Sequence, residues 1–591
     1  MMNGHADRLA AVRSAMQAQS LHGLLVPRGD EHLSEYVPPS AARLAWLTGF
    51  TGSAGVAVVL EDRAAVFTDG RYTLQLAAET DPALWERRHI MEEPPGPWTA
   101  SHAGPEARIG YDPMLMSDGG LAGYREAGLT LVEANPNPVD VAWTDRPAPP
   151  GAPALPYPIR YAGKDSAEKR SEIAAALRTA KRDAAVVTDP ASIAWLLNIR
   201  GSDVAYTPFA LGFLIIEADQ RATLFMDPAK LPDETRRWLG DGVALRPRDQ
   251  MEPALAEFRG KRVQVDAAGS PIWFAERLRA AGAEVVDAMD PCALPKACKN
   301  AAEQEGARAA HRRDAVAVCR FLHWLSTMAG RTTEIGAADQ LLAFRRELPD
   351  FRGESFPAIS GAGEHGAIIH YRVTPDTDRA VREHEVYLID SGAQYLDGTT
   401  DITRTVWTGP GPAPDAVRDR ATRVLKGHIV VATTIFPEGV AGPHLDAFAR
   451  RALWQIGLDY DHGTGHGVGS YLSVHEGPAS LSRAGKTVPL ASGMILSDEP
   501  GFYRPGEYGI RLENLLLVQP AEFPEAKKPF LRFEVLTLAP FDRRLIEPAL
   551  LNDAEREWVD RYHARVAREI GPLLTGDART WLETACAPLA D

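Results

Sequence analysis

Short apolar runs alternate with helical stretches along about the first half of the chain. Residues 23–26 and 184–187 each follow a helical stretch and have the length and composition of a buried strand. Residues 57–60 and 211–216 are further apolar runs of strand length. Because strands that alternate with helices build layered folds, this pattern predicts α/β architecture.

A short motif occurs twice in this part of the chain. Leu44-Ala45-Trp46-Leu47 is followed by Gly52-Ser53, and Ile193-Ala194-Trp195-Leu196 is followed by Gly201-Ser202, so the two copies are 149 residues apart. Each copy comes after one of the short strands and leads into further apolar strands. The repetition predicts two related α/β domains.

The remaining part of the chain has a different pattern. Residues 301–348 are helical in period, whereas residues 385–389, 401–407, 494–499 and 510–518 are β-type runs. Helices grouped beside antiparallel hairpins predict an α+β domain. This part also holds 11 of the 16 histidines, so we expect the chemistry here.

Two proline-containing segments mark the predicted domain boundaries. Residues 135–158 hold eight prolines, which block regular structure and stiffen a linker. Residues 290–299 hold two more, and Asn300 with Glu303 then has the spacing of a helix N-cap. We therefore predict three domains, at residues 1–152, 153–299 and 300–591.

Composition narrows the class of protein. Of 591 residues, 45% are hydrophobic and 24% are charged, which is typical of folded globular chains. The net charge of −15 argues against nucleic acid and anionic membranes as partners, since both attract basic surfaces. No apolar run approaches a membrane span, and the N-terminus lacks a signal-peptide core. The four cysteines are too scattered for a disulfide framework. We expect a reduced, cytoplasmic protein.

Two acidic hairpins are the first candidate for chemistry. An apolar run delivers Asp390, a turn at Asp397-Gly398 reverses the chain, and Asp401 begins the return strand. Buried carboxylates require cations or protons. The simpler alternative is that these acids cap turns or pair with Arg404.

The second hairpin repeats the arrangement. Glu499 ends one strand, Pro500-Gly501 follows, and Glu513 lies on the next apolar run. Surface salt bridges are the alternative here, although the apolar neighbours argue against full exposure.

A glycine-rich histidine segment lies between the hairpins. His462-Gly463-Thr464-Gly465-His466-Gly467-Val468-Gly469 is followed by Val474-His475-Glu476-Gly477-Pro478, and His370 ends an earlier apolar run. The glycine spacing matches neither the dinucleotide fingerprint nor a P-loop. A single histidine is most often structural, but three beside two acidic hairpins indicate a site.

Four carboxylates and one imidazole suit two divalent cations. The negative charges balance two ions, which bridging carboxylates hold about 3.5–4 Å apart. Oxygen-rich ligation favours Mn²⁺, with Zn²⁺ and Co²⁺ as alternatives, whereas a structural zinc site usually has thiolates. A bridging hydroxide would be the nucleophile, and the other histidines would bind substrate and move protons.

These residues carry a specific resemblance. Asp390, Asp401, His466, Glu499 and Glu513 match in order the ligands of the pita-bread dinuclear metallopeptidases. The segments around His370, Asp390, His462 and His475 look like those of the Xaa-Pro aminopeptidase family in its three-domain form. Thr68-Asp69-Gly70-Arg71-Tyr72 and Ile199-Arg200-Gly201-Ser202-Asp203 resemble its two non-catalytic, creatinase-like domains, and the segment after Leu536 resembles its C-terminal extension.

The resemblance implies hydrolysis of the first peptide bond of peptides with proline at the second position. Asp390 would bind one metal, Asp401 and Glu513 would bridge, and His466 and Glu499 would complete the site. His370 and His475 would contact the substrate, with His462 nearby. Arg71 matches a substrate-contacting arginine. Members are commonly manganese-dependent homodimers.

Three other functions remain open. A prolidase acts on Xaa-Pro dipeptides alone, which requires a closed pocket that sequence does not show. Pita-bread folds also serve as non-catalytic binding modules, but these tend to lose ligands, and all five are present here. The two extra domains disfavour a methionine aminopeptidase.

Overall fold

The computed structural model describes residues 4–589. The chain divides into two compact units, Met1–Ala293 and Leu294–Asp591. Each has its own hydrophobic core.

The first unit contains two six-stranded sheets. In spatial order, the first consists of β4 (Glu86–His89), β3 (Ala64–Thr68), β2 (Val56–Leu60), β1 (Gly23–Pro27), β5 (Arg108–Tyr111) and β6 (Thr130–Glu133). The second consists of β12 (Val243–Arg246), β11 (Ala222–Phe225), β10 (Phe213–Glu217), β8 (Ala184–Val187), β13 (Arg262–Val265) and β14 (Glu284–Asp287).

The two sheets share one topology. In each, the third strand is antiparallel to the second and to the fourth, and the remaining neighbours are parallel. Their central strands are buried along almost their whole length, as expected of strands covered on both faces. The prediction of two related α/β domains is therefore confirmed.

The repeated motif lies on corresponding helices. It falls on α2 (Arg43–Thr48) and α9 (Pro190–Leu197), which follow β1 and β8. Leu47 and Leu196, at equivalent places in the motif, are both fully buried. The motif recurs because each domain packs the same apolar positions of this helix into its core.

The other helices of the first unit flank the sheets. They are α1 (His5–Ala18), α3 (Thr73–Glu79), α4 (Pro95–Ala103), α5 (Asp118–Glu126), α7 (Ile159–Ala162), α8 (Ser166–Thr179), α10 (Asp233–Leu239), α11 (Met251–Ala256) and α12 (Ile272–Ala280).

The proline-rich segment is less irregular than we predicted. A short helix, α6 (Pro138–Ala142), forms within it, and β7 (Leu155–Pro156) pairs with β9 (Ile199–Arg200). Pro138 occupies the first turn, where no intrahelical N–H donor is needed, and the Asn137 side chain accepts from Val139 N. Prolines thus start this helix instead of preventing it.

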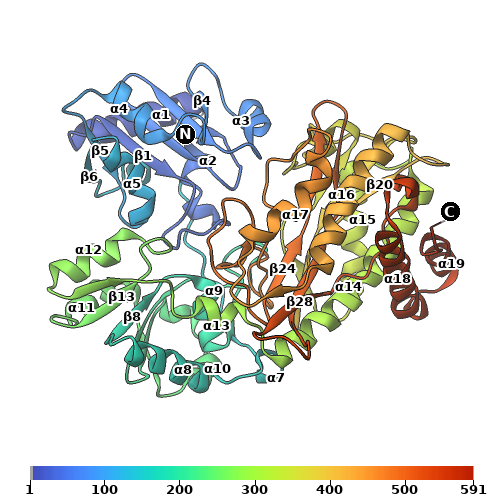
Figure 1. Cartoon of the computed structure of the whole chain (residues 1–591). Helices are drawn as coiled ribbons and strands as arrows, with labels where there is room; N and C mark the ends of the chain where they lie inside the picture. The colour runs from blue at the N-terminus through green and yellow to red at the C-terminus, as the bar shows by residue number, and fades with distance from the viewer. Residues whose placement is uncertain (1–3, 590–591) are drawn as a thin grey trace. The chain divides into compact units, whose positions relative to one another are not determined.

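The second unit begins with the predicted helix. α14 (Ala301–Met328) has a capping box in which Asn300 and Glu303 each bond the other's backbone N–H, so this prediction is confirmed. Its other helices are α15 (Glu334–Arg346), α16 (Asp415–Thr433), α17 (Pro443–Trp454), α18 (Asp553–Ile570) and α19 (Gly576–Ala585). The short α13 (Ala293–Ala297) lies at the division between the two units. α16 and α17 lie side by side (Figure 1).

Antiparallel sheets complete the second unit. One contains β16 (Ile359–Ala362), β17 (Val386–Ser391) and β20 (Ile402–Trp407); another contains β21 (Phe436–Pro437), β28 (Phe530–Val535), β27 (Asn514–Ala521) and β24 (Ile495–Asp498). Smaller sheets are β15 (Phe351–Glu354) with β18 (Ala393–Tyr395) and β19 (Gly398–Thr399), β22 (Gly465–His466) with β23 (Ser480–Leu481), and β25 (Gly501–Arg504) with β26 (Tyr508–Arg511).

The strand that we predicted over residues 510–518 is interrupted. β26 ends at Arg511 and β27 begins at Asn514, because the chain changes partner from β25 to β24 and β28. Glu513 lies in the interruption, between the last residue of β26 and the first residue of β27.

Candidate metal centre

The first acidic hairpin forms as expected. β17 pairs antiparallel with β20, with Asp390 opposite Thr403, and Asp401 comes directly before β20. Asp390 is 8% exposed and Asp401 is 4% exposed. Both carboxylates are therefore buried at the same end of this strand pair.

The second strand pair brings the two glutamates beside them. β24 and β27 pair so that Asp498 is opposite Asn514, which leaves Glu499 and Glu513 just beyond the paired residues. The Glu513 backbone N–H donates to Thr403 O at 3.1 Å. The Thr403 hydroxyl donates to Glu513 Oε2 at 2.8 Å. This junction joins the two strand pairs and gathers all four carboxylates.

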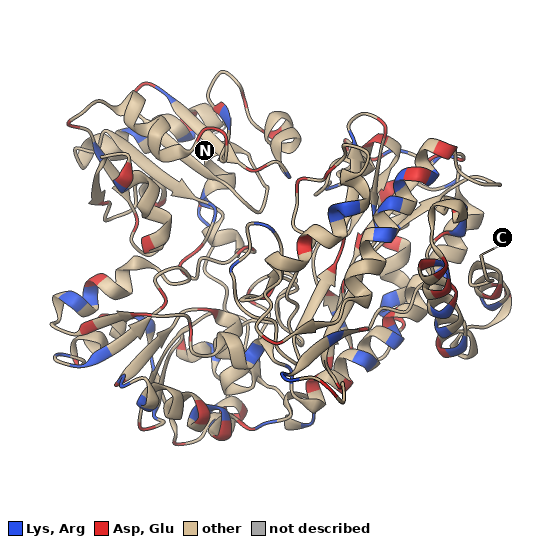
Figure 2. Ribbon diagram, in the orientation of Figure 1, with Lys and Arg blue, Asp and Glu red and all other residues tan. Residues whose placement is uncertain are grey.

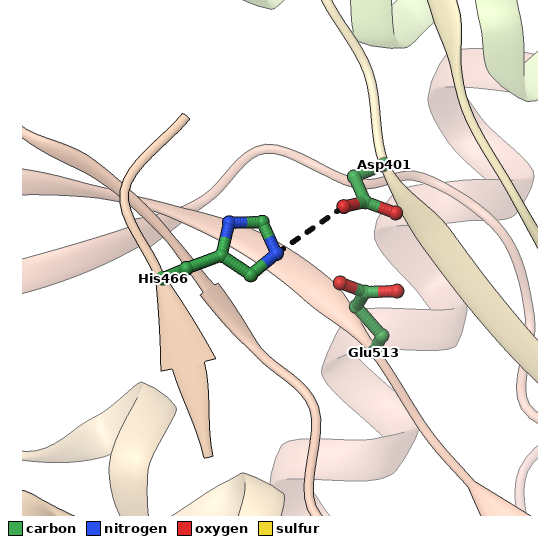
Figure 3. Close-up of side chains that lie close together, drawn as sticks. All are labelled: Asp401, His466 and Glu513. Atoms are coloured by element: carbon green, nitrogen blue, oxygen red, sulfur yellow. Dashed lines mark ion pairs between the residues drawn. The ribbon is translucent and has the colours of Figure 1, made fainter. Parts of the chain in front are cut away.

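His466 approaches the carboxylates from β22. Its Nε2 lies 3.5 Å from Asp401 Oδ2 and 3.5 Å from Glu499 Oε1. Figure 3 shows the ring directed toward Asp401 and Glu513. Ligand atoms of these three side chains all lie within 4.8 Å of one another. A Cβ on Gly465 would lie 1.9 Å from Ser497 O, so glycine is required for β22 to come this close.

Crowding of acids changes their titration. Burial, together with the neighbouring carboxylates Asp401, Asp390 and Glu499, raises the pKa of Glu513 well above its usual range. Burial likewise raises the pKa of Glu499 to about 7. Burial disfavours the His466 cation, but the hydrogen bond to Asp401 and the charge of Glu499 outweigh it and raise its pKa to about 9.

The donor set fits divalent cations. Among the described residues, Oδ1 of Asp390 and Oδ1 of Asp401 find no hydrogen-bond partner although both are buried, which is costly unless another positive group satisfies them. Four carboxylates and one imidazole nitrogen match the oxygen-rich ligation of two such ions. The residues present therefore fit a dinuclear metal site.

His462 belongs to a chain of polar contacts that ends at Asp390. Arg511 donates to Asp390 Oδ2 and to the Tyr503 hydroxyl, both at 2.7 Å. The hydroxyl in turn lies 2.8 Å from His462 Nε2, while His462 Nδ1 lies 2.7 Å from Gly463 O, which can only accept. The contact with Gly463 O therefore requires a proton on Nδ1 of His462.

The other two histidines lie differently. The His475 side chain is exposed, and its ring stands 4.3 Å from the ring of His466 at an interplanar angle of 89°. His370 is half-buried and follows the 3₁₀ turn Gly363–Ala367. A Cβ on Gly509 would lie 1.7 Å from Gly366 O, so the backbone of this turn packs directly on β26.

Arg71 lies in the other unit of the chain. It follows β3 and makes a bidentate ion pair with Asp69, with contacts of 2.9 and 2.7 Å. This is a local interaction between residues two positions apart.

Sequence reasoning missed Arg511, Tyr503 and Thr403, which contact the candidate ligands or His462. It offered Arg404 as the ion-pair partner of the hairpin acids, and this alternative is wrong. In the observed register Asp390 is opposite Thr403 and Ile389 is opposite Arg404, so Arg404 points to the other face. The available signal for Arg511 was a basic residue in an apolar run, two positions before Glu513.

Comparison with known families defines the class of protein. Residues 305–520 match the family described as "Metallopeptidase family M24", and residues 529–589 match the "C-terminal region of peptidase_M24". Residues 8–140 and 145–303 each match a "Creatinase/Prolidase N-terminal domain". The fold class predicted above, two creatinase-like domains followed by a pita-bread domain, is confirmed.

Relatives that match the whole chain define the family more narrowly than the family models do. The chain is 39% identical to the "Probable Xaa-Pro aminopeptidase P" of Laccaria bicolor, over 99% of this chain and 93% of that protein. It is 39% identical to that of Neurospora crassa, over 98% of this chain and 89% of that protein. The chain belongs to the Xaa-Pro aminopeptidase P family.

Solved structures agree with this assignment. The X-prolyl aminopeptidase of Caenorhabditis elegans, described as a cytosolic enzyme with a di-nuclear active site, superposes with a TM-score of 0.93 at 33% identity, covering 99% of this chain and 100% of that chain. The prolidase of Thermococcus sibiricus matches 64% of this chain and 98% of its own at 21% identity, with a TM-score of 0.51, which shows the fold alone. No helix of the described residues is long and apolar enough to cross a membrane.

Proposed function

We propose that this protein is a dinuclear metal-dependent aminopeptidase that hydrolyses the first peptide bond of peptides with proline at the second position. The observation that carries the proposal is the buried cluster of Asp390, Asp401, His466, Glu499 and Glu513, in a chain whose full-length relatives are named Xaa-Pro aminopeptidase P. The presence of all five candidate metal ligands favours an enzyme over a non-catalytic binding module. Prolidase is less well supported, because the prolidase structure matches only part of the chain.

The candidate ligands would hold two divalent ions, which we propose are Mn²⁺. Asp401 and Glu513, at the junction of the two strand pairs, would bridge them. Asp390 would complete the ligands of one ion, and His466 and Glu499 would complete those of the other. When bound, the ions lower the pKa of water and polarise a carbonyl oxygen.

We assign delivery of a proton to the leaving group to side chains of this protein. The leaving group is the prolyl nitrogen, a secondary amine that requires a proton as the bond breaks. His462 Nε2 is engaged with the Tyr503 hydroxyl at 2.8 Å, so we assign it an assisting role. His475, exposed beside His466, and Glu499 are the candidates for the proton donor. His370 and His475 would contact the substrate, and the family resemblance implies the same role for Arg71.

A pair of tripeptides tests the proposal. Arg-Pro-Pro should be cleaved after Arg, whereas Arg-Ala-Ala should be cleaved poorly. Proline has no amide N–H, so a site shaped for it presents an apolar wall against the ring instead of an acceptor. Comparable kcat/KM on the two peptides would refute the proline assignment, and failure to cleave either would refute the peptidase. A dipeptide Arg-Pro cleaved in preference to Arg-Pro-Pro would instead indicate a prolidase.

We further propose three domains, at residues 1–152, 153–299 and 300–591, a cytoplasmic location and a homodimer. The cytosolic description of the worm relative supports the location.

Trp454, which ends α17, and Ile456 just after it are 44% and 37% exposed, which supports an apolar contact between copies. Figure 2 shows acidic and basic residues interspersed along α16 and α18, so neither helix offers a surface of a single charge. Light scattering should give the mass of two chains, and Trp454→Glu should lower it to one.

A further inference from the structure

Arg404 is a buried cation next to the candidate metal ligands. It lies on β20, three residues after Asp401, and is 1% exposed. Within residues 4–589 it forms no ion pair. All of its hydrogen bonds go to neutral oxygens: Thr403 O, Glu513 O, Asn514 Oδ1, Ala539 O, Pro540 O and the Tyr562 hydroxyl. A buried charge held only by neutral acceptors needs an explanation.

One side of the guanidinium holds the junction of the metal-ligand strands. Arg404 Nη1 donates to Thr403 O at 2.9 Å and to Glu513 O at 2.6 Å. The same two residues exchange the hydrogen bonds that join the two acidic strand pairs. Arg404 therefore ties together the backbone that presents Asp401 and Glu513.

The other side holds the C-terminal segment. Arg404 Nη2 donates to Ala539 O at 2.8 Å and to the Tyr562 hydroxyl of α18 at 3.0 Å. That hydroxyl also lies 2.8 Å from Ala539 O. The guanidinium carbon is 4.4 Å from the ring centroid of Phe541, and Tyr562 stacks on Trp558 with an interplanar angle of 1°. The aromatic rings thus fix Tyr562 and Arg404 against each other.

A branch of the same network reaches the second strand pair. Asn514 Oδ1 accepts from Arg404 at 2.8 Å, and its amide nitrogen donates to His428 Nε2 at 3.0 Å. His428 Nδ1 then faces Asp498 O and Oδ2, both at 3.0 Å. Asn514, His428 and Asp498 have no exposed surface. Asn514 follows Glu513 and Asp498 precedes Glu499, so the network touches the backbone beside both glutamates.

We propose that Arg404 and Tyr562 are positioning residues. Through them the C-terminal segment holds the backbone beside the metal ligands in place. This inference rests on the proposed metal centre. Partners that orient metal ligands usually change metal affinity by 10–100-fold when removed. A residue that only docked α18 would change stability and leave metal affinity unaltered.

Tyr562→Phe is the decisive variant, because it removes one hydroxyl and keeps the ring stacking. Calorimetry on chelator-treated protein should show Mn²⁺ binding about tenfold weaker than in the wild type. At limiting Mn²⁺ the turnover number should fall, and excess Mn²⁺ should restore it with KM for Arg-Pro-Pro unchanged. The electron paramagnetic resonance spectrum of bound Mn²⁺ should also change, since the ligands are less constrained.

Val559→Ala is the matched control on the same helix. Val559 is fully buried one turn before Tyr562 and has no polar atoms in its side chain. Its truncation should lower the melting temperature by loosening α18 while Mn²⁺ affinity stays that of the wild type. Arg404→Lys would leave several buried carbonyl groups without a hydrogen-bond donor and endanger folding, so it serves only as a second variant. It should bind Mn²⁺ more weakly than Tyr562→Phe.

The outcomes separate the hypotheses. Wild-type Mn²⁺ affinity in Tyr562→Phe overturns the inference, and so does equal weakening in Val559→Ala, which would mean a general loosening of the fold. Wild-type protein that binds no Mn²⁺ overturns the proposed manganese centre and this inference with it.

Discussion

Metal binding should release protons from the ligand cluster. Ligation requires ionised carboxylates and a neutral imidazole. In the metal-free protein, the pKa of His466 is raised to about 9 by its contacts with Asp401 and Glu499, and burial raises the pKa of Glu499 to about 7. Both groups therefore carry protons at neutral pH that Mn²⁺ must displace.

The size of the effect follows from these two values. At pH 7, His466 is almost fully protonated and Glu499 is about half protonated, so these two groups alone should release about 1.5 protons when Mn²⁺ binds. The apparent affinity should accordingly rise by at least about thirtyfold per pH unit around pH 7. Glu513, whose pKa is also raised by burial and by Asp401, adds to this release and does not reduce it.

The assay is titration calorimetry with Mn²⁺ on chelator-treated protein, in buffers of different ionisation enthalpy at the same pH. The slope of the observed heat against that enthalpy counts the protons. Glu499→Gln, which cannot titrate, should release about half a proton fewer at pH 7. A flat slope, with affinity independent of pH between 6 and 8, would show that the acids and His466 do not form one site.

The same pKa directions predict how pH changes the stability of the metal-free protein. The folded-state pKa of Glu499 is raised from 4.5, so its ionisation destabilises the folded protein as pH rises from about 4.5 to about 7. The raised pKa of His466 contributes stability that is complete below about 6.5 and is lost as pH rises through about 9. Both act in one direction, so chelated protein should melt at a lower temperature at pH 8.5 than at pH 5.5. A higher melting temperature at pH 8.5 would contradict the reasoning.

Three substitutions test separate features of the second unit. Asp401→Ala should lose both ions, measured as metal content, and lose more activity than Asp390→Ala, because a bridging carboxylate serves two ions; full activity after chelation would contradict this. His475→Ala should keep its metals but lose turnover by a factor on the order of 10²–10⁴, the usual range for a proton-transfer group, and an unchanged kcat would exclude that role. Glu476→Gln leaves the buried ammonium group of Lys299, 2.5 Å away, without its counter-ion, at a cost of about 3–5 kcal/mol, and thermal unfolding should show a clear loss of stability.

Several features of this protein were readable from the sequence, because short-range physics determines them. The Asn300–Glu303 capping box lies within one turn of helix, and it started α14 where predicted. The repeated motif around Trp46 and Trp195 revealed two related domains, because the same buried positions recur in each. In the glycine-rich histidine segment, the absence of a side chain at Gly465 lets the backbone of β22 approach Ser497 O.

The site residues are a harder case. Their order and spacing matched a known ligand pattern, and the structure brings Asp401, His466 and Glu513 within 4.8 Å. Their roles as ligands, and those of His370, His462, His475 and Arg71, stay predictions until metal and substrate binding are measured.

Tertiary structure alone decided which partners these residues meet. Strand register assigned Thr403 to the face of Asp390 and turned Arg404 away, and a shift of one residue would have reversed both. The hydrogen bond between Thr403 and Glu513 spans 110 residues, and that between Arg404 and Tyr562 spans 158. Local pattern cannot specify contacts at such separations, because it fixes which face of a strand is buried but not which distant strand or helix covers it.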